Sequence, residues 1–255
     1  MSPMPRHHRP FLSALAATIA LGLSVANVHA QISDACCVAP DNGFGTALLP
    51  PPVGAGGCFY LGNTEIIDGL PIGSTIQISA SYGTFSGVVE VPGGSLLGTV
   101  SDFNAVMSLS MTGTGTLLGF NRFIQIPLNT GNNRISWAPR TAFAPVQNLL
   151  ADLERLNGQV PCCGDPDFDL LRITGGTNFG MPTAGQAQLV TSAGNWATSS
   201  FFDIFHRIDF VGAAAGQLAG RSGSTSLTRR FTMCPGNVVP VKDSTWGGIK
   251  ALLLN

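Results

Sequence analysis

The sequence predicts an all-β protein, folded as a disulfide-stapled β-sandwich or barrel with one or two short helices. The first observation is a series of short runs of β-branched and aromatic residues, interrupted at close intervals by Gly, Pro, Asn and Ser. The second is composition: glycine supplies 32 of 255 residues and only 11% are charged, which suits short strands and tight turns better than long solvated helices. The third is the presence of six cysteines, an even number that predicts a disulfide framework in an exported chain.

Residues 1–30 have the features of a secretory signal peptide. A basic start at residues 6–9 precedes an apolar run over residues 11–25, and the cleavage pattern Val-His-Ala ends at residue 30. The apolar run has about fifteen residues, whereas a membrane-spanning helix needs about twenty. We therefore expect export to the periplasm, the cell surface or the extracellular medium, and a mature protein that begins at Gln31.

Charge argues against nucleic acid as a partner. Without the signal segment the chain keeps eleven basic residues (thirteen less Arg6 and Arg9) and fourteen acidic ones, a net charge of −3 with no basic stripe. No later segment is long and apolar enough for a transmembrane helix. The partner that we expect is a cell-surface or matrix component, or a glycan.

The six cysteines are expected to form three disulfides. Adjacent cysteines rarely bond each other because the small ring strains the disulfide, so the pairing should join distant segments and stays open. A zinc cluster is the alternative, but zinc sites use Cys-x2–4-Cys pairs, which this spacing lacks. The cysteines are Cys36, Cys37, Cys58, Cys162, Cys163 and Cys234.

The domain organisation follows from where strand patterns begin and end. Residues 31–64 contain a Pro- and Gly-rich stretch that cannot hold a regular ladder, so we expect an irregular segment anchored by its cysteines. Residues 65–240 form the predicted β domain, and residues 241–255 form a C-terminal tail. The predicted strand regions are residues 74–91, 104–111, 121–128, 169–174, 187–192, 201–212 and 226–233.

Two parts of the β domain, residues 66–140 and 165–234, share a pattern that indicates an internal duplication. Each contains a Gly-x-Pro triplet, at residues 69–71 and 180–182. The duplication predicts two similar β units packed face to face, and chance similarity of glycine- and leucine-rich sequence is the alternative. The further matches pair Phe103, Leu109, Gly113, Gly115, Leu117 and Gly119 with Phe202, Ile208, Gly212, Gly216, Leu218 and Gly220.

One segment, residues 144–158, has helical periodicity. Its apolar residues fall on one helical face, Pro145 suits the first turn, and Gly158 suits a stop. The tail offers a second short helix, capped by Ser244 or Thr245. We therefore predict one helix in the β domain and a short one in the tail.

Histidine is scarce, which excludes several catalytic sites. Three of the four histidines lie in the signal segment, so sites built from two or more histidines have no basis. His206 alternates with apolar residues and is expected on the buried face of its strand, satisfied by a local hydrogen bond. The Gly-x-Ser-x-Gly, Ser-x-x-Lys and phosphate-loop motifs are absent too, which leaves paired carboxylates as the enzymatic alternative.

Three aspartates at alternate positions, Asp165, Asp167 and Asp169, form the candidate metal site. Asp-x-Asp-x-Asp is the start of a calcium-binding loop, so calcium is the candidate cofactor. The loop is not an EF-hand, because Leu170 and Gly176 stand where that motif needs Gly and Glu. The alternative is a strand that begins with one solvated face carrying all three carboxylates.

A second polar cluster, Asp203, Arg207 and Asp209, lies on one face of the strand predicted at residues 201–212. Opposite charges on one face of a strand form a ladder with their neighbours, which explains the cluster without a ligand. A binding site is the competing interpretation.

The stretches "GDPDFDLLRITGG", "NFGMP" and "SFFDIFHRIDFVG" resemble a group of exported bacterial β-rich proteins that are themselves uncharacterised. The resemblance covers roughly residues 65–235 and implies export and a β-rich fold. Members of that group usually have an aromatic residue where His206 stands, which implies that this histidine is not catalytic. The ending "STWGGIKALLLN" is similar to tails of exported surface proteins, which implies a docking or sorting role. No functional residue carries over from the resemblance.

These observations predict an exported, non-enzymatic binding or structural module for a surface or matrix component. The alternative is an exported polysaccharide-active hydrolase or lyase that uses paired carboxylates, either among Asp165, Asp167 and Asp169 or at Asp203 and Asp209. An open cleft lined by those acids and by an aromatic residue such as Trp196 would indicate the enzyme.

Overall fold

The computed structural model describes residues 37–52, 58–160 and 165–233. The chain divides into two units, Met1–Ala30 and Gln31–Asn255, and every described residue belongs to the second. The predicted signal segment, the tail at residues 241–255 and four of the six cysteines lie outside the described residues. Those cysteines are Cys36, Cys162, Cys163 and Cys234.

The prediction of an all-β fold is confirmed. Strands make up 64% of the described residues, which contain no helix of seven residues or more. None of the described helical segments has the length and apolar character that crossing a membrane requires. The strands are β1 (Val38–Pro40), β2 (Tyr60–Ile66), β3 (Ile76–Gly93), β4 (Gly98–Gly113), β5 (Asn121–Leu128), β6 (Asn133–Trp137), β7 (Val146–Gln159), β8 (Phe168–Gly175), β9 (Thr183–Ser192), β10 (Asn195–Gly212) and β11 (Ser222–Met233), and the 3-10 turns are η1 (Gly115–Leu117), η2 (Thr130–Asn132) and η3 (Thr177–Phe179).

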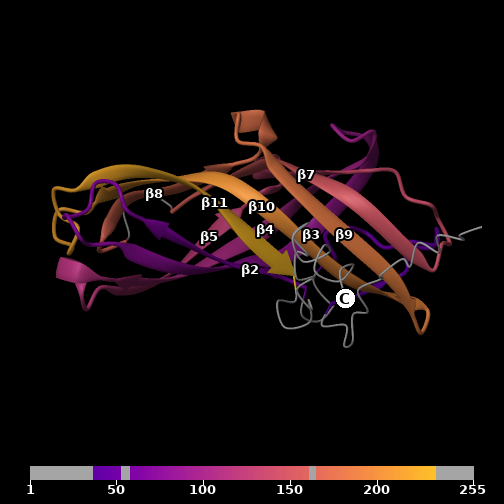
Figure 1. Ribbon diagram of the computed structural model, residues 1–255, viewed down its shortest axis with the longest axis horizontal. Helices are drawn as coiled ribbons and strands as arrows, with labels where there is room; N and C mark the ends of the chain where they lie inside the picture. The colour runs from indigo at the N-terminus through magenta and orange to yellow at the C-terminus, as the bar shows by residue number, and fades with distance from the viewer. Residues whose placement is uncertain (1–36, 53–57, 161–164, 234–255) are drawn as a thin grey trace, which may run out of the picture. The chain divides into compact units, whose positions relative to one another are not determined.

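The strands form one antiparallel sheet that closes on itself through β10 (Figure 1). Its hydrogen-bonded order is β1-β10-β11-β2-β3-β4-β6-β7-β8, and β8 pairs back to β10. Two long strands change partners along their length: β10 pairs with β9 and then β8, and β4 pairs with β6 and then β5. The predicted choice between sandwich and barrel therefore resolves to a closed sheet whose inward side chains form one core.

The centre of the core is aromatic. The rings of Tyr60, Tyr82 and Phe85 contact one another at centroid distances of 5.3–6.1 Å. The Tyr60 hydroxyl donates to Ser200 Oγ at 3.0 Å. The Tyr82 hydroxyl donates to Asn133 Oδ1, also at 3.0 Å. Burial raises the pKa of both phenols, so these hydroxyls stay neutral and keep their hydrogen bonds.

The prediction of a helix at residues 144–158 is wrong, because nearly all of this segment belongs to strand β7. Up to Leu153 its burial alternates as a strand requires, with Leu149 buried and Leu150 exposed. The register opposite β6 then shifts, so the next buried leucine after Leu153 is Leu156. This irregularity produces an apolar spacing of three that imitates a helix. Pairing with β6, β8 and β9 supplies the backbone hydrogen bonds and overrides the local periodicity.

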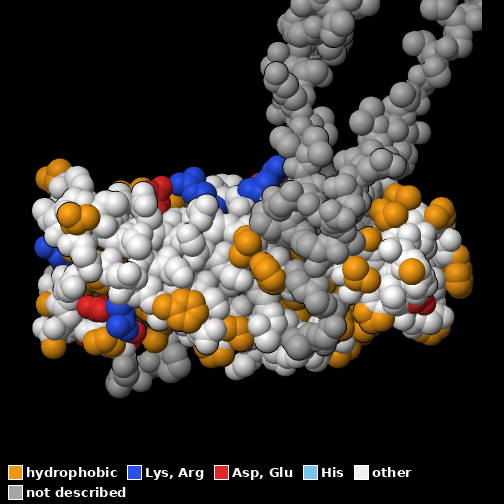
Figure 2. Space-filling model, turned by 90° about the horizontal axis from the view of Figure 1, so that it is seen from below, with side chains coloured by type: hydrophobic (Ala, Val, Ile, Leu, Met, Phe, Trp, Pro, Cys, Tyr) orange, Lys and Arg blue, Asp and Glu red, His pale blue; other side chains and the backbone are white. Residues whose placement is uncertain are grey.

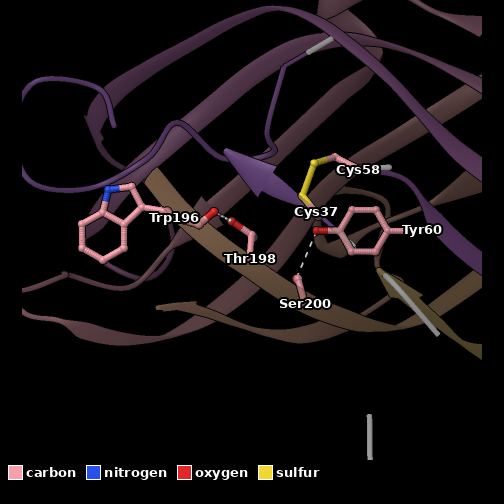
Figure 3. The surroundings of a disulfide bond; sticks show 6 residues. All are labelled: Cys37, Cys58, Tyr60, Trp196, Thr198 and Ser200. Carbon is pink, nitrogen blue, oxygen red and sulfur yellow. Dashed lines mark hydrogen bonds between the residues drawn. A yellow bond between two sulfur atoms is a disulfide. The ribbon is translucent and has the colours of Figure 1, made fainter. Parts of the chain in front are cut away.

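The segment predicted as irregular, residues 31–64, contains β1 and most of β2. Strand structure therefore begins before residue 65, which corrects the predicted boundary. Between the two strands, residues 41–52 hold no strand, as their prolines and glycines predict. A disulfide between Cys37 and Cys58 closes this loop and confirms one bridge of the predicted framework (Figure 3).

The two hairpins that carry the predicted repeat have the same turn construction. At the end of β4, Gly113 donates its N–H to the residue that precedes β5, at 2.9 Å; at the end of β10, Gly212 donates to the residue that precedes β11, at 2.8 Å. A side chain at either glycine would collide with a carbonyl oxygen of its own turn, that of Leu117 or Leu218. This close approach requires glycine and explains the match between Gly113 and Gly212. The duplication itself remains a prediction.

Candidate functional site

The candidate site is built on the irregular loop that follows β1. Thr198 N donates to Cys37 O at 2.8 Å, beside the disulfide to Cys58 (Figure 3). The indole N–H of Trp196 donates to Asp41 Oδ2 at 2.7 Å. This hydrogen bond is the main cause that lowers the pKa of Asp41, so the carboxylate stays charged and keeps accepting. The loop is therefore fastened to β2 and β10 at its beginning.

A buried ion pair joins this loop to β3 and to the connection between β6 and β7. Nη2 of Arg140 donates to both carboxylate oxygens of Glu90 at 2.7 Å. Nη1 of Arg140 donates to Ala47 O at 2.6 Å and to Thr46 Oγ1 at 3.2 Å. Leu49 N donates to Glu90 Oε1 at 3.2 Å. Because the two charges neutralise each other, the pair crosslinks three segments without presenting a net charge.

Three large apolar side chains stand exposed near this ion pair. Phe44, Leu97 and Phe143 are 74%, 83% and 78% exposed. Leu97 and Phe143 have a φ of 63°, a left-handed conformation that costs a bulky residue about 1–3 kcal/mol. Phe143 N donates to Gly45 O at 2.9 Å, and the Phe143 ring fills the space that a side chain at Gly45 would need. Strain and exposure thus coincide at two residues, a combination found at functional loops.

A cavity of about 400 Å³ opens between the ion pair and two of these side chains, Phe44 and Leu97. Phe44, Leu97 and Pro139 line its apolar side. Thr99 also lines it, and the Thr99 hydroxyl oxygen is buried without a hydrogen-bond partner among the described residues. The volume falls within the range of small-molecule sites, roughly 300–1,000 Å³. The largely apolar lining suits an apolar ligand group.

The three aspartates of the predicted metal site do not share a solvated face. Arg122 binds two of them: its Nη2 donates to Asp165 Oδ2 at 2.7 Å, and its Nε lies 3.2 Å from Asp167 Oδ2, whereas Asp169 is exposed. The expectation of one solvated face is wrong because Asp165 Oδ1 accepts the N–H groups of Asp167 and Phe168, a turn that breaks strand alternation. The part of the chain that the structure describes contains no group of three or more His, Cys, Asp or Glu residues that could hold a metal ion. Calcium at Asp165 and Asp167 would have to displace Arg122.

The second predicted cluster forms the charge ladder that strand alternation indicates. Arg230 of β11 binds Asp203 through two hydrogen bonds, at 2.7 and 2.8 Å. Arg172 of β8 binds Asp209 at 2.9 Å, and Arg207 Nε lies 3.2 Å from the same carboxylate. We call these five residues the charged ladder. Its carboxylates are bound by arginines of three strands.

The electrostatics of the charged ladder favour ionised acids. Hydrogen bonds from Arg230 hold the pKa of Asp203 below its usual value. Burial raises the pKa of Asp209, but hydrogen bonds from Ser224 and Arg172 outweigh it and the net shift is downward. Figure 2 shows a related arrangement on one face of the protein, where acidic and basic side chains gather in small groups within uncharged surface.

His206 is buried in the core, as strand alternation predicts. Its Nε2 lies 2.8 Å from Thr64 Oγ1, and its Nδ1 lies 3.1 Å from Ile204 O. Since a carbonyl oxygen only accepts, Nδ1 carries the proton of the neutral ring and Nε2 accepts from the Thr64 hydroxyl. Burial lowers the pKa of His206, which keeps the ring neutral. Both ring nitrogens are therefore bonded inside the protein.

Trp196 is the aromatic residue that the enzymatic interpretation would place in a cleft beside the acids. It is 2% exposed, and its indole N–H donates to Asp41 instead.

The exposed apolar residues around the cavity could not be identified from the sequence, because they come from three turns that are distant in the sequence. A local signal is present nevertheless: Phe44-Gly45 and Leu97-Gly98 place a large apolar residue beside glycine outside any strand interior. In most turns the residue beside glycine is small and polar, so a large apolar residue at that position is unusual.

Comparison with known proteins assigns no family to the chain. No family model matches the sequence, and neither a curated protein nor a solved structure is detectably similar to it. The function is therefore inferred from the residues and geometry of this chain.

Proposed function

We propose that the protein is an exported, non-enzymatic module that binds a cell-surface or matrix component through the cavity beside Arg140 and Glu90. The observation that carries this proposal is the coincidence of strain and exposure at Leu97 and Phe143. Glycine would adopt the same backbone conformation without strain and without exposing an apolar side chain. Retaining large apolar residues there lowers stability, a cost that is common where a site serves binding.

The walls of the cavity are fixed before any ligand arrives. The disulfide, the Trp196–Asp41 hydrogen bond and the buried ion pair hold the loop after β1 at separate points. A site that is already in place loses less conformational freedom on binding, which raises affinity. The disulfide also supports export, because such bonds persist in oxidising compartments.

The chemistry of the walls favours an uncharged, largely apolar ligand group. The ion pair is neutral and its hydrogen bonds are made, so a charged group would lose hydration without gaining a partner. Apolar atoms of the ligand would lie against Phe44 and Leu97.

The alternative, a polysaccharide-active hydrolase or lyase, has less support. Its general acid needs a carboxyl group with a raised pKa. The pKa values of Asp203 and Asp209 are lowered instead. Asp165 and Asp167 share Arg122 and are held in a turn. These contacts favour structural roles for the acids that the enzymatic interpretation would use.

Replacement of Leu97 by glycine separates binding from folding. We expect L97G to bind N-phenyl-1-naphthylamine, an uncharged apolar fluorescent probe, about tenfold more weakly than the wild type, as for loss of one apolar side chain from a site. The same variant should melt no lower than the wild type, because glycine adopts a φ of 63° without strain. Fluorescence titration and thermal melting measure the two effects.

Leu118 provides the matched control. It is 85% exposed, but its φ is −56° and it lies in the turn between β4 and β5, outside the cavity lining. L118G is therefore expected to keep the probe affinity of the wild type. Equal loss of binding in both variants, or no loss in either, would contradict the proposal.

A further inference from the structure

Three rows of paired residues on the outer face of strands β2 to β5 consist largely of uncharged polar side chains, and we call these rows the polar face. Strand alternation turns these residues outward, because the residues between them are buried in the core. Glu65 also points outward here, and Arg229 Nη2 donates to Glu65 Oε1 at 2.7 Å. Register aligns the residues of this face in three rows across the strands: Asn63–Ser79–Ser110–Phe123, Glu65–Gln77–Thr112–Asn121 and Leu61–Ser81–Ser108–Gln125.

The polar groups of this face are largely unused by the protein. Of the described residues, Gln125 and Ser108 bond each other, at 3.2 Å, and no other hydrogen bond joins two uncharged side chains of the polar face. The charged ladder differs, because its side chains bind one another across three strands. The polar face therefore presents hydroxyl and amide groups that are available to a ligand.

A hollow of about 410 Å³ lies on the polar face where β2 and β11 diverge. Ladder pairing between these strands ends at Gly62 and Phe231. Farther along, a side chain of β11 replaces the backbone ladder: Thr225 Oγ1 accepts the N–H groups of Ile67 and Asp68, at 3.0 and 2.9 Å. Between these two points no backbone ladder joins the described residues of the two strands, and the hollow lies there. A concave surface allows a ligand to be contacted from several sides.

Four uncharged members of the polar face contribute to the lining of this hollow, together with the Glu65–Arg229 ion pair. Hydroxyl groups both donate and accept hydrogen bonds, and side-chain amides do the same through separate atoms. The uncharged members are Asn63, Gln77, Ser79 and Thr112.

We infer that the polar face binds an uncharged polysaccharide. Sugar hydroxyl groups also donate and accept, so they match a surface of hydroxyls and amides without needing a charge. Neighbouring strands repeat about every 4.8 Å, so each row offers polar groups at regular intervals, as a polymer of identical units requires. Phe123 is exposed in the row beside the hollow and offers a ring face to the apolar side of a sugar.

Other classes of partner fit this surface less well. A charged polymer would find the one acid of the rows already paired with Arg229. A protein partner would be expected to bury several aromatic or arginine side chains at the centre of its contact, and the rows contain Phe123 alone. The inference rests on the proposed function, since it assigns a ligand class to the same exported module, but it uses a different surface.

Affinity electrophoresis tests the inference on the oxidised mature chain. The native gels would contain hydroxyethyl cellulose, amylose, galactomannan or arabinoxylan as uncharged polymers, and carboxymethyl cellulose as a charged relative of the first. We expect at least one uncharged polymer to retard the wild type, with carboxymethyl cellulose retarding it less than hydroxyethyl cellulose. Q77A and F123A should each weaken the binding about tenfold.

Gln186 supplies a matched control, because it is an exposed glutamine on β9, outside the polar face. Q186A should bind as the wild type does, and L97G should too, since Leu97 lines the other cavity. Retardation by none of the uncharged polymers would overturn the inference, as would equal loss in Q77A and Q186A. Loss in L97G without loss in Q77A would overturn it while supporting the cavity beside Arg140. Thermal melting of each variant identifies any loss that comes from unfolding.

Discussion

The Arg140–Glu90 pair beside the cavity and the Arg230–Asp203 pair of the charged ladder have the same shortest N–O distance, 2.7 Å. The side chains of the first pair are 8% and 10% exposed, and those of the second are 58% and 39% exposed. Water screens the exposed pair, whereas the buried charges depend on each other because both have lost their hydration. Ion pairs with the same N–O distance therefore have different structural consequences, and the buried pair is the one that joins the segments around the cavity.

Breaking the buried pair should have the largest effect. In R140M the Glu90 carboxylate stays buried without its counterion, so we expect a loss of about 3–5 kcal/mol in the free energy of unfolding. Urea denaturation at pH 7.5 measures it. The double variant R140M/E90Q should regain a large part of the loss, because the remaining amide is neutral. A double variant no more stable than R140M would show that the ion pair is not the cause.

Removing the disulfide should have the next largest effect, since it fastens the same loop. Cys37 and Cys58 are separated by 21 residues in the sequence. A crosslink across a loop of this size stabilises a protein by about 3 kcal/mol, largely by restricting the unfolded chain. We expect C58S to lose about that much in urea denaturation. Unchanged stability in C58S would mean that the loop after β1 is held without the disulfide.

His206 is buried in the neutral form, so its protonation should make the free energy of unfolding depend on pH. The pKa of His206 is lowered by burial, so below pH about 6.5 the unfolded chain binds a proton that the folded chain resists. Stability is therefore full above that pH and falls as the pH decreases. H206Q should lose less unfolding free energy than the wild type between pH 7.5 and pH 5.0. An equal loss in both proteins would assign the pH dependence to other groups.

The exposed pair should give the smallest effect. D203N removes the charge that Arg230 binds, and we expect a change of roughly 0–1 kcal/mol because both side chains are largely solvated. The effect should shrink further in 1 M salt, which screens exposed charges. A loss comparable to that of R140M would remove the distinction between the two pairs.

Features that depend on local alternation could be predicted from the sequence. The buried position of His206 and the shared face of Asp203, Arg207 and Asp209 follow from the two-residue period of a strand, and the structure confirms both. The all-β fold follows in the same way from strand-forming runs and turn residues.

Features that depend on distant segments could not be predicted. The irregular register opposite β6 gave β7 an apparent helical period, because the extra residue is defined by the partner strand. Asp165 and Asp167 look solvated until β5 brings Arg122 to them. The walls of the cavity come from the loop after β1, the β3–β4 hairpin and the β6–β7 connection, and no local pattern brings these together.

The most direct test compares two matched double variants, R140M/E90L and R230M/D203L, by titration with N-phenyl-1-naphthylamine after each has been shown to fold. Each replaces one arginine–carboxylate pair by apolar side chains, so neither leaves an unpaired charge. We expect the first variant to weaken probe binding about tenfold, because the segments that form the cavity are no longer joined, and the second to leave it unchanged. Equal probe affinity in the two variants would contradict the claim that the buried pair shapes the binding site.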